Sequence, residues 1–372
     1  MNLLQQKMHG TVLEINLDAL TNNLNFYRSR LSPPTKIMVM VKAFAYGSGS
    51  QEVANLLQFH RVDYLAVAYA DEGVTLRENG ITLPVMVMNP SPANFSQIVR
   101  YNLEPEIYSL SQLKSWLNFI VNSQKVVPVH LKLDTGMHRL GFEPKEAEEL
   151  ISILLKNPQL KIASIFTHLA GSDEAQHNDF SHQQAVLFKK MTTAIVEKVG
   201  IKPLLHILNS PGIIRFPEYH FDMVRLGIGL YGVEVNKQFQ DQLIPISTLK
   251  TTISQIKEIR AGESIGYSRK GLAKKDITIA TIAIGYADGF SRKLSNGKGV
   301  VLVNGKEAPV VGNVCMDMTM IDITGISAEE GDEVIIFGKE RPISVLASEI
   351  GTIPYEILTN VSERVKRIFF SE

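Results

Sequence analysis

The sequence predicts an α/β protein made of a (β/α)8 TIM-type barrel followed by a mainly β C-terminal domain. Eight short apolar runs alternate with stretches of helical periodicity over about 220 residues, close to the ~250 residues of a typical barrel of this kind. Past about residue 240, strand-like segments follow one another closely. The length of 372 residues fits about two domains.

The eight apolar runs have the length of buried strands. They cover residues 36–43, 64–69, 84–89, 104–109, 128–134, 162–168, 204–209 and 221–227. Between them, segments such as 52–59, 71–80 and 144–157 repeat apolar residues at the spacing of amphipathic helices. An open doubly wound sheet is the alternative arrangement for this alternation.

A further strand is predicted over residues 11–17, where Leu13, Ile15 and Leu17 alternate with polar residues. We assign residues 11–240 to the barrel domain. Pairing of the 11–17 strand with the second domain is the alternative for this segment.

The second domain is predicted over residues 241–372, and its boundary with the barrel is not marked by a low-complexity linker. Strands are expected within 248–259, 276–286, 299–312 and 331–338. The dipeptide Asn304-Gly305 is a strong signal for a two-residue hairpin turn. A helix-like tail is expected near residues 352–369.

Composition excludes several classes of protein. Lys plus Arg and Asp plus Glu both number 38, so the net charge is +0, and bulk charge draws the chain neither to nucleic acid nor to an anionic membrane. The single Cys315 excludes an intrachain disulfide and zinc sites built from CxxC pairs. No apolar stretch reaches the ~20 residues that span a bilayer.

The opening MNLLQQKMHG lacks the apolar region of a signal peptide, and we expect a cytoplasmic protein. His177 and His182 are isolated from other ligands, so no metal site is expected. The glycines of GIGLYG at 227–232 fit G-x-G-x-x-G, but no helix of a βαβ unit follows. A dinucleotide site is therefore not expected.

Candidate functional residues lie where the apolar runs end, which is where barrels of this type carry their chemistry. Lys42 closes the first run and is followed by a glycine-containing turn with Tyr46. Burying a lysine is costly unless the charge is paired or neutralised. The alternative is a lysine whose side chain reaches the solvent at the rim.

Charged and small residues end the later runs as well. They are Lys132, Arg139, His168, Asn209, Ser210, Arg225, Gly227 and Ile228. The small residues after the seventh and eighth runs occupy the common phosphate position of this fold, where backbone N–H groups can face an anion. A lysine, a phosphate site and a basic group between them indicate pyridoxal 5′-phosphate bound to Lys42 as a Schiff base.

The sequence resembles the alanine racemases, which are fold type III pyridoxal phosphate enzymes. The resemblance lies in motifs that follow the family's order along nearly the whole chain: VKAFAYGSG, HLKLDTGMHRLGF, FTHLA, NSPG, MVRLGIGLYG, GESIGYS, AIGYADGF, VGNVCMDM and TIPYEIL. It implies racemisation of L- and D-alanine, which supplies D-alanine for peptidoglycan. Lys42 holds the cofactor and serves as one base, and Tyr267 serves as the other on the opposite face.

The resemblance also implies the remaining roles. Phosphate contacts fall to Tyr46, Ser210, Gly227, Ile228 and Tyr355, with Asn209 beside them in NSPG. His168 stacks on the cofactor ring, and Arg225 faces its pyridine nitrogen. Arg139 and the Met316 backbone hold the substrate carboxylate, and Tyr286 narrows the entrance.

Lys132 matches a lysine that is often carbamylated in the family, and a carbamate would supply an anion for Arg139. Unmodified, Lys132 would pair with Asp134 or with a partner of Arg139. The resemblance further implies a homodimer whose active site is shared, with Tyr267 coming from the partner subunit.

Three residues depart from the family pattern: Phe44, Ser48 and Asn313. We expect none of them to touch a proton carrier. Two alternatives to an alanine racemase are a broader amino-acid racemase that accepts serine and a non-catalytic pyridoxal phosphate-binding protein. The second domain with Tyr267 argues against the non-catalytic reading.

Overall fold

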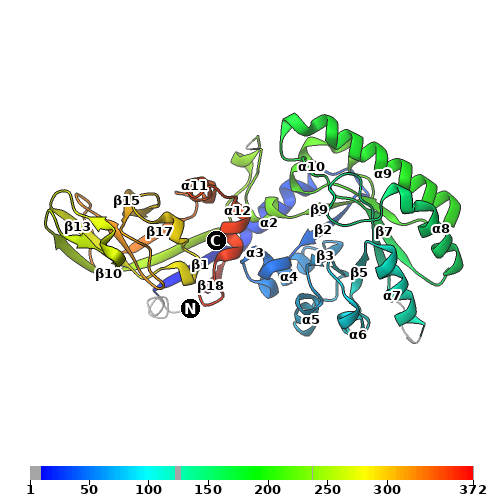
Figure 1. The fold of residues 1–372 in the computed structure, drawn as a ribbon, viewed down its shortest axis with the longest axis horizontal. Helices are drawn as coiled ribbons and strands as arrows, with labels where there is room; N and C mark the ends of the chain where they lie inside the picture. The colour runs from blue at the N-terminus through cyan, green and yellow to red at the C-terminus, as the bar shows by residue number, and fades with distance from the viewer. Residues whose placement is uncertain (1–9, 122–126, 237, 372) are drawn as a thin grey trace.

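The chain forms two parts, which lie at opposite ends of the view in Figure 1. The structure is a computed structural model that describes residues 10–121, 127–236 and 238–371. Most of the opening segment, in which we expect no signal peptide, lies outside these ranges. One part holds the parallel strands and most of the helices, and the other is mainly β (Figure 1).

The first part contains the predicted eight parallel strands in the order β8-β7-β6-β5-β4-β3-β2-β9. Each predicted apolar run contains one of them: β2 (Lys36–Met40), β3 (Tyr64–Val67), β4 (Val85–Val87), β5 (Glu104–Ile107), β6 (Val129–Lys132), β7 (Ile162–Phe166), β8 (Leu204–His206) and β9 (Met223–Leu226). The end strands β8 and β9 approach each other, since the Asp222 and Arg225 amides donate to Leu205 and Leu208 carbonyls at 3.1 and 2.9 Å. The sheet is thus a nearly closed barrel, and the predicted fold class is confirmed.

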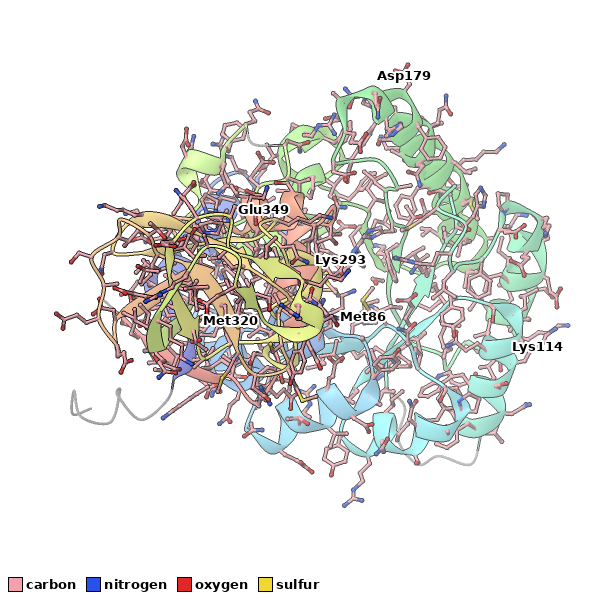
Figure 2. All side chains as sticks on the ribbon, turned by 60° about the vertical axis from the view of Figure 1, so that its left-hand side comes forward. Met86, Lys114, Asp179, Lys293, Met320 and Glu349 are labelled. Carbon is pink, nitrogen blue, oxygen red and sulfur yellow. The ribbon has the colours of Figure 1, made fainter. Side chains whose placement is uncertain are left out.

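Helices accompany the barrel strands: α2 precedes the first of them, α3 and α10 carry residues of the cavity at the mouth, and larger helices such as α7 and α9 lie on the outside (Figure 1). They are α2 (Leu17–Arg28), α3 (Lys42–Tyr46), α4 (Ser50–Phe59), α5 (Ala70–Glu78), α6 (Phe95–Arg100), α7 (Leu110–Ile120), α8 (Ala147–Lys156), α9 (Asn178–Val199) and α10 (Ser210–Arg215). Lys114 of α7 and Asp179 of α9 are exposed at the outer edge (Figure 2). The strands are buried on both faces, as expected for parallel sheets covered by helices.

The second part is an antiparallel β structure built around a long strand. Its strands are β10 (Ser247–Ile259), β11 (Ser264–Ile265), β12 (Gly271–Leu272), β13 (Ile277–Ile282), β14 (Val300–Val303), β15 (Lys306–Val311), β16 (Thr319–Asp322) and β17 (Glu333–Phe337). The predicted hairpin is confirmed: Val303 pairs with Lys306, and Asn304 and Gly305 have φ of 49° and 73°. Both values suit a two-residue turn of the type that matches strand twist.

The first strand of the chain belongs to this second sheet. β1 (Thr11–Asn16) pairs antiparallel with β10 and parallel with β18 (Lys366–Phe370). The two ends of the described chain therefore lie side by side in one sheet. This is the alternative that the sequence left open for residues 11–17.

The helical prediction for residues 352–369 is wrong in its second half. Two short helices, α11 (Ile343–Glu349) and α12 (Pro354–Asn360), precede β18. The last segment is extended because β1 offers it a parallel partner, with Leu13 opposite Arg367 and Ile15 opposite Phe369. Tertiary pairing here overrides the local pattern. Helix α12 lies between the two parts, close to α3 (Figure 1).

Within the described ranges, no helix is both long enough and apolar enough to cross a membrane.

Candidate active site

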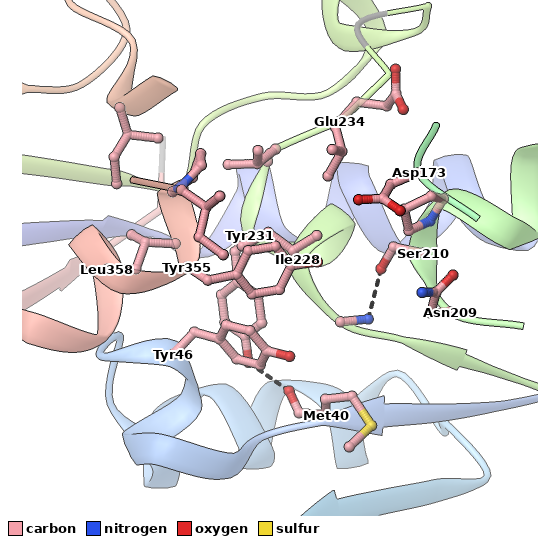
Figure 3. Close-up of a pocket in the computed structure, with 18 of the residues that line it drawn as sticks. Met40, Tyr46, Asp173, Asn209, Ser210, Ile228, Tyr231, Glu234, Tyr355 and Leu358 are labelled. Carbon is pink, nitrogen blue, oxygen red and sulfur yellow. Dashed lines mark hydrogen bonds between the residues drawn. The ribbon is translucent and has the colours of Figure 1, made fainter. Parts of the chain in front are cut away.

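A cavity of about 1230 Å³ opens at the carboxyl ends of the barrel strands. Ten of the predicted site residues line it: Lys42, Tyr46, Arg139, His168, Asn209, Ser210, Arg225, Gly227, Ile228 and Tyr355. Figure 3 shows part of this wall, with Tyr46 and Tyr355 on one side and Ser210 and Asn209 on the other. The fold therefore brings residues from distant parts of the chain to one place.

The segment after Lys42 has an unusual backbone. Residues 43–46 are all non-glycine and have φ between 50° and 55°. Left-handed backbone costs roughly 1–2 kcal/mol per L-residue, so other contacts must hold this turn. The Glu72 carboxylate of α5 accepts from the Ala43 amide at 2.6 Å and from the Ala68 and Tyr69 amides at 2.7 and 3.0 Å.

A close backbone approach fixes the far end of the same turn. Gly47 has φ of 79°, and a Cβ atom there would lie 2.2 Å from the Leu358 carbonyl oxygen of α12. Only glycine fits this position. The contact places Tyr46 near Tyr355, whose ring centroids are 5.9 Å apart.

Lys42 has an environment that favours its neutral amine. Burial and, to a lesser extent, the nearby Arg139 lower the pKa of Lys42, while Glu72 acts in the opposite direction. A neutral amine is the form that attacks an aldehyde or accepts a proton. Lys42 is therefore suited both to hold a cofactor and to act as a base.

Arg225 of β9 is 2% exposed and is held by several acceptors. It donates to His206 Nδ1 and to the Thr167 carbonyl, both at 2.7 Å, and to the Ile207 carbonyl at 3.1 Å. Burial lowers the pKa of Arg225 to about 10, which still leaves the guanidinium charged at neutral pH.

The contacts of Arg225 fix the tautomers of a buried chain of polar groups. A guanidinium can only donate, so His206 Nδ1 accepts and its Nε2 donates to Ser164 Oγ at 2.9 Å. Ser164 Oγ also bonds to His130 Nδ1 at 2.7 Å, and His130 Nε2 donates to Glu104 at 2.9 Å. Burial and Arg225 lower the pKa of His206 well below its usual range, which agrees with a neutral ring.

His168 also lies against Arg225, with its Nδ1 3.1 Å from the guanidinium Nη2. The same reasoning makes this nitrogen an acceptor. Burial and Arg225 lower the pKa of His168 well below its usual range, so the ring facing the cavity is neutral.

The opposite wall is a cradle for an anion. Ser210 Oγ accepts from the Gly227 and Gly229 amides at 2.9 and 3.2 Å. A Cβ atom at Gly227 would lie 3.0 Å from the Tyr46 hydroxyl and 3.8 Å from Ser210 Oγ. Glycine thus keeps open the space beside the Tyr46 and Ser210 hydroxyls, where an anion could accept hydrogen bonds.

Tyrosines line the rest of the cradle. The Tyr46 ring lies 4.6 Å from that of Tyr231, which donates its hydroxyl proton to the Met40 carbonyl at 2.8 Å (Figure 3). Burial raises the pKa of Tyr355 to about 12, so its hydroxyl remains a donor at neutral pH. An amine, a set of anion donors and an arginine in one cavity fit pyridoxal phosphate. Among the described residues, we find no group of three side chains that could hold a metal ion.

Lys132 has a partner that the sequence did not indicate. Its Nζ lies 3.0 Å from Glu106 Oε1 of β5. The expected pairing with Asp134 is wrong, because that carboxylate accepts from the Gly136 and His138 amides at 2.9 and 3.1 Å. The sequence did contain a sign of this pairing. Glu104 and Glu106 are two residues apart in one barrel strand, and His130 and Lys132 are two residues apart in the next.

Three predicted residues of the second part lie away from this cavity. Tyr267, Tyr286 and Met316 are 69%, 44% and 53% exposed and are not part of its wall. Tyr286 and Met316 lie together, since the Tyr286 and Ala287 amides donate to the Cys315 and Met316 carbonyls at 3.0 Å. Within one chain, Tyr267, which we predicted to be the second proton carrier, is not among the residues that line the cavity with Lys42.

The three residues that depart from the family pattern lie in different environments. Phe44 is 39% exposed, and Ser48 is fully buried. Asn313 was expected not to touch a proton carrier, and this is wrong: its Nδ2 donates to the Tyr267 carbonyl at 3.2 Å. Asn313 and Tyr267 are 46 residues apart in the sequence, so no local pattern indicated this contact.

Comparison with known proteins agrees with this site. The chain matches the family models "Alanine racemase, N-terminal domain" over residues 15–235 and "Alanine racemase, C-terminal domain" over residues 246–369. It is 38% identical to the alanine racemase of Clostridium tetani over 371 residues, covering 96% of this chain and 95% of that one.

Solved structures give the same result. An alanine racemase of Clostridium difficile superposes with a TM-score of 0.91 and 37% identity, over 98% of this chain and 96% of that chain. The alanine racemase of Bartonella henselae, solved with covalently bound pyridoxal phosphate, gives 0.90 and 30% identity over 97% and 99%. The chain belongs to the alanine racemase family.

Proposed function

We propose that this chain interconverts L- and D-alanine with Lys42 and Tyr267 as its two proton carriers. It is an isomerase with alanine racemase function, and it uses pyridoxal phosphate. The observation that carries the residue assignment is the meeting of Lys42, Arg225 and the Ser210 cradle in one cavity. The product D-alanine serves peptidoglycan synthesis, and a cytoplasmic location is part of the proposal.

The cofactor, when bound, withdraws electrons from the Cα atom of an amino acid and so makes its proton acidic. Lys42 Nζ holds the cofactor until substrate enters and then accepts or returns the Cα proton. Its lowered pKa supports this role, since burial and Arg139 favour the neutral amine. A positioned base of this kind contributes about 10²–10⁴-fold to a rate.

Arg225 would face the ring nitrogen of the bound cofactor and, as a guanidinium, would keep its protons. The guanidinium stays charged at neutral pH and is fixed by His206 and two carbonyls. An acid in this place would transfer a proton to the ring and strengthen electron withdrawal. Arg225 therefore favours return of the proton to Cα over side reactions.

The anion cradle holds the cofactor phosphate. Tyr46, Tyr355 and Ser210, whose Oγ accepts from the Gly227 and Gly229 amides, would supply hydroxyls, and Gly227, Ile228 and Asn209 complete the wall. His168, with its neutral ring, packs on the cofactor ring. Arg139 and the Met316 backbone hold the substrate carboxylate, and Tyr286 limits the size of the side chain.

Tyr267 requires a second copy of the chain. Its side chain is 69% exposed, and Tyr286 and Met316 are exposed beside Cys315. A homodimer in which the second domain of one subunit covers the barrel mouth of the other would bring these residues to Lys42. Mixing Lys42→Ala with Tyr267→Phe under exchange conditions should then restore activity, because one of the two sites in a mixed dimer is intact. No recovery would contradict the shared site.

The reaction itself is tested by giving L-alanine to the purified protein with its cofactor and following D-alanine by chiral chromatography. We expect D-alanine to accumulate until the enantiomers are equal. A protein that shows the absorbance of lysine-bound cofactor but forms no D-alanine would refute the proposal. A second arm with L-serine measures how strictly the site selects alanine.

A further inference from the structure

A carboxylate is buried in the barrel beside Lys132. Glu106 of β5 is 0% exposed, and Lys132 is 3% exposed. The Lys132 Nζ atom lies 3.0 Å from Glu106 Oε1, and neither oxygen of Glu106 has a well-formed hydrogen bond among the described residues. An unpaired carboxylate in such a place would be costly, so the charge of Lys132 is its main compensation.

Glu106 is surrounded by the cations of the active site. Lys132 and, more weakly, Arg225 and His130 lower the pKa of Glu106 against the effect of burial, which is larger. Glu106 in turn acts on Lys42 and raises the pKa of that amine. Glu106 thus interacts with basic side chains on β6 and β9 and with Lys42, which follows β2.

Glu106 opposes the mutual repulsion of these cations, as Glu72 does at Lys42. Burial is the largest cause that lowers the pKa of Lys132; Glu106 acts in the opposite direction, and Arg139 and Arg225 lower it further. Burial and then Arg139 lower the pKa of Lys42. Lys132 and Arg225 both lie over the Phe166 ring, at 5.5 and 5.1 Å from its centroid. The cluster needs an anion between its members.

We propose that Glu106 is a positioning residue that supplies the buried anion of this site and keeps Lys132 as an unmodified ammonium ion. The inference rests on the function proposed above, in which Lys42, Arg139 and Arg225 handle cofactor and substrate. Glu106 touches neither of these and acts through Lys132, which it fixes beside Phe166.

The alternative anion for this place is a carbamate on Lys132. To form it, the neutral Nζ attacks the carbon of CO2, an N–C bond forms, and one Nζ proton leaves to solvent. The product carries a negative charge within contact distance of the Glu106 carboxylate. Two like charges in a buried site strongly disfavour each other, so one anion excludes the other. Glu106 therefore takes the place of the carbamate in this chain.

The test is carbon NMR of the holoenzyme in ¹³C-labelled bicarbonate, without substrate. We expect no carbamate resonance in the wild type and a bicarbonate-dependent resonance in Glu106→Gln, which has the same shape but no charge. The double variant with Lys132→Arg should lose that resonance. A wild-type resonance that Lys132→Arg removes would overturn the proposal, and so would a Glu106→Gln protein that stays silent.

Activity provides a second measurement, because a purely structural role of Glu106 would not make activity depend on bicarbonate. We expect Glu106→Gln to lose activity and to regain part of it when bicarbonate is added, while wild-type activity is independent of bicarbonate. A loss that bicarbonate does not relieve would count against the role of Glu106. The NMR result needs no turnover, so it separates failure of this inference from failure of the proposed function.

Discussion

Arg225 donates a hydrogen bond of 2.7 Å to Nδ1 of His206, and this contact fixes the tautomer of that ring. Because the guanidinium cannot accept, His206 must donate through Nε2 to Ser164, whose Oγ also lies 2.7 Å from Nδ1 of His130. Arg225 is thereby anchored to Glu104 through a chain of buried polar side chains.

The first prediction concerns Ser164, which is 0% exposed and bonds to both His206 and His130. Ser164→Ala leaves nitrogens of His206 and His130 without partners. Each buried group left unpaired costs about 1–3 kcal/mol, and we expect the free energy of unfolding in urea to fall by that order. Ser181→Ala is the matched control, because the buried Ser181 hydroxyl has no hydrogen-bond partner among the residues that the structure describes. Equal losses in both variants would contradict the chain.

The second prediction concerns the anion cradle. Gly227→Ala would place a Cβ atom 3.0 Å from the Tyr46 hydroxyl. Overpacking typically costs about 1–3 kcal/mol, so the dissociation constant of pyridoxal phosphate should rise roughly tenfold to hundredfold. A titration of the apoprotein that follows cofactor absorbance measures it. Gly325→Ala, in open space with φ of 77°, should affect stability only, and unchanged affinity in Gly227→Ala would disprove the cradle.

The third prediction concerns the pKa of Lys42. Arg139 lowers it and Glu72 raises it, so removing each charge should have opposite effects. Arg139→Gln removes a cation and raises the pKa, which moves the onset of Lys42 reactivity to higher pH. Glu72→Gln removes an anion and moves the onset to lower pH. The rate at which the apoprotein forms the lysine-bound cofactor, measured against pH, reports both, and shifts in the same direction would refute the electrostatic explanation.

The fourth prediction concerns the Met316 backbone. A Cβ atom at Gly285 would lie 2.3 Å from the Met316 carbonyl oxygen, so Gly285→Ala must displace this loop. We expect the KM for alanine to rise while the absorbance of lysine-bound cofactor is unchanged, because Met316 is assigned to substrate and not to cofactor. Gly305→Ala, with no atom within 4 Å of its added Cβ, is the control. An unaltered KM in Gly285→Ala would argue against a substrate role for this loop.

The sequence by itself determined the features that depend on neighbours along the chain. Strand and helix lengths in the barrel follow from local periodicity, and the turn at Asn304-Gly305 follows from residues that tolerate positive φ. Lys42, Ser210 and Arg225 could be predicted to lie together because the carboxyl ends of barrel strands meet at one mouth, and they do line one cavity. The homodimer and the individual site roles remain predictions, which the resemblance implied.

Only the tertiary structure decided which distant groups meet. The pairing of Lys132 with Glu106, and not Asp134, depends on the register between β5 and β6, in which Glu106 lies opposite His130. The contact of Asn313 with Tyr267 depends on the folding of the second sheet. The last strand is extended only because β1 lies beside it. Local periodicity carries no information about register or strand partners, since these are set by packing between segments far apart in the chain.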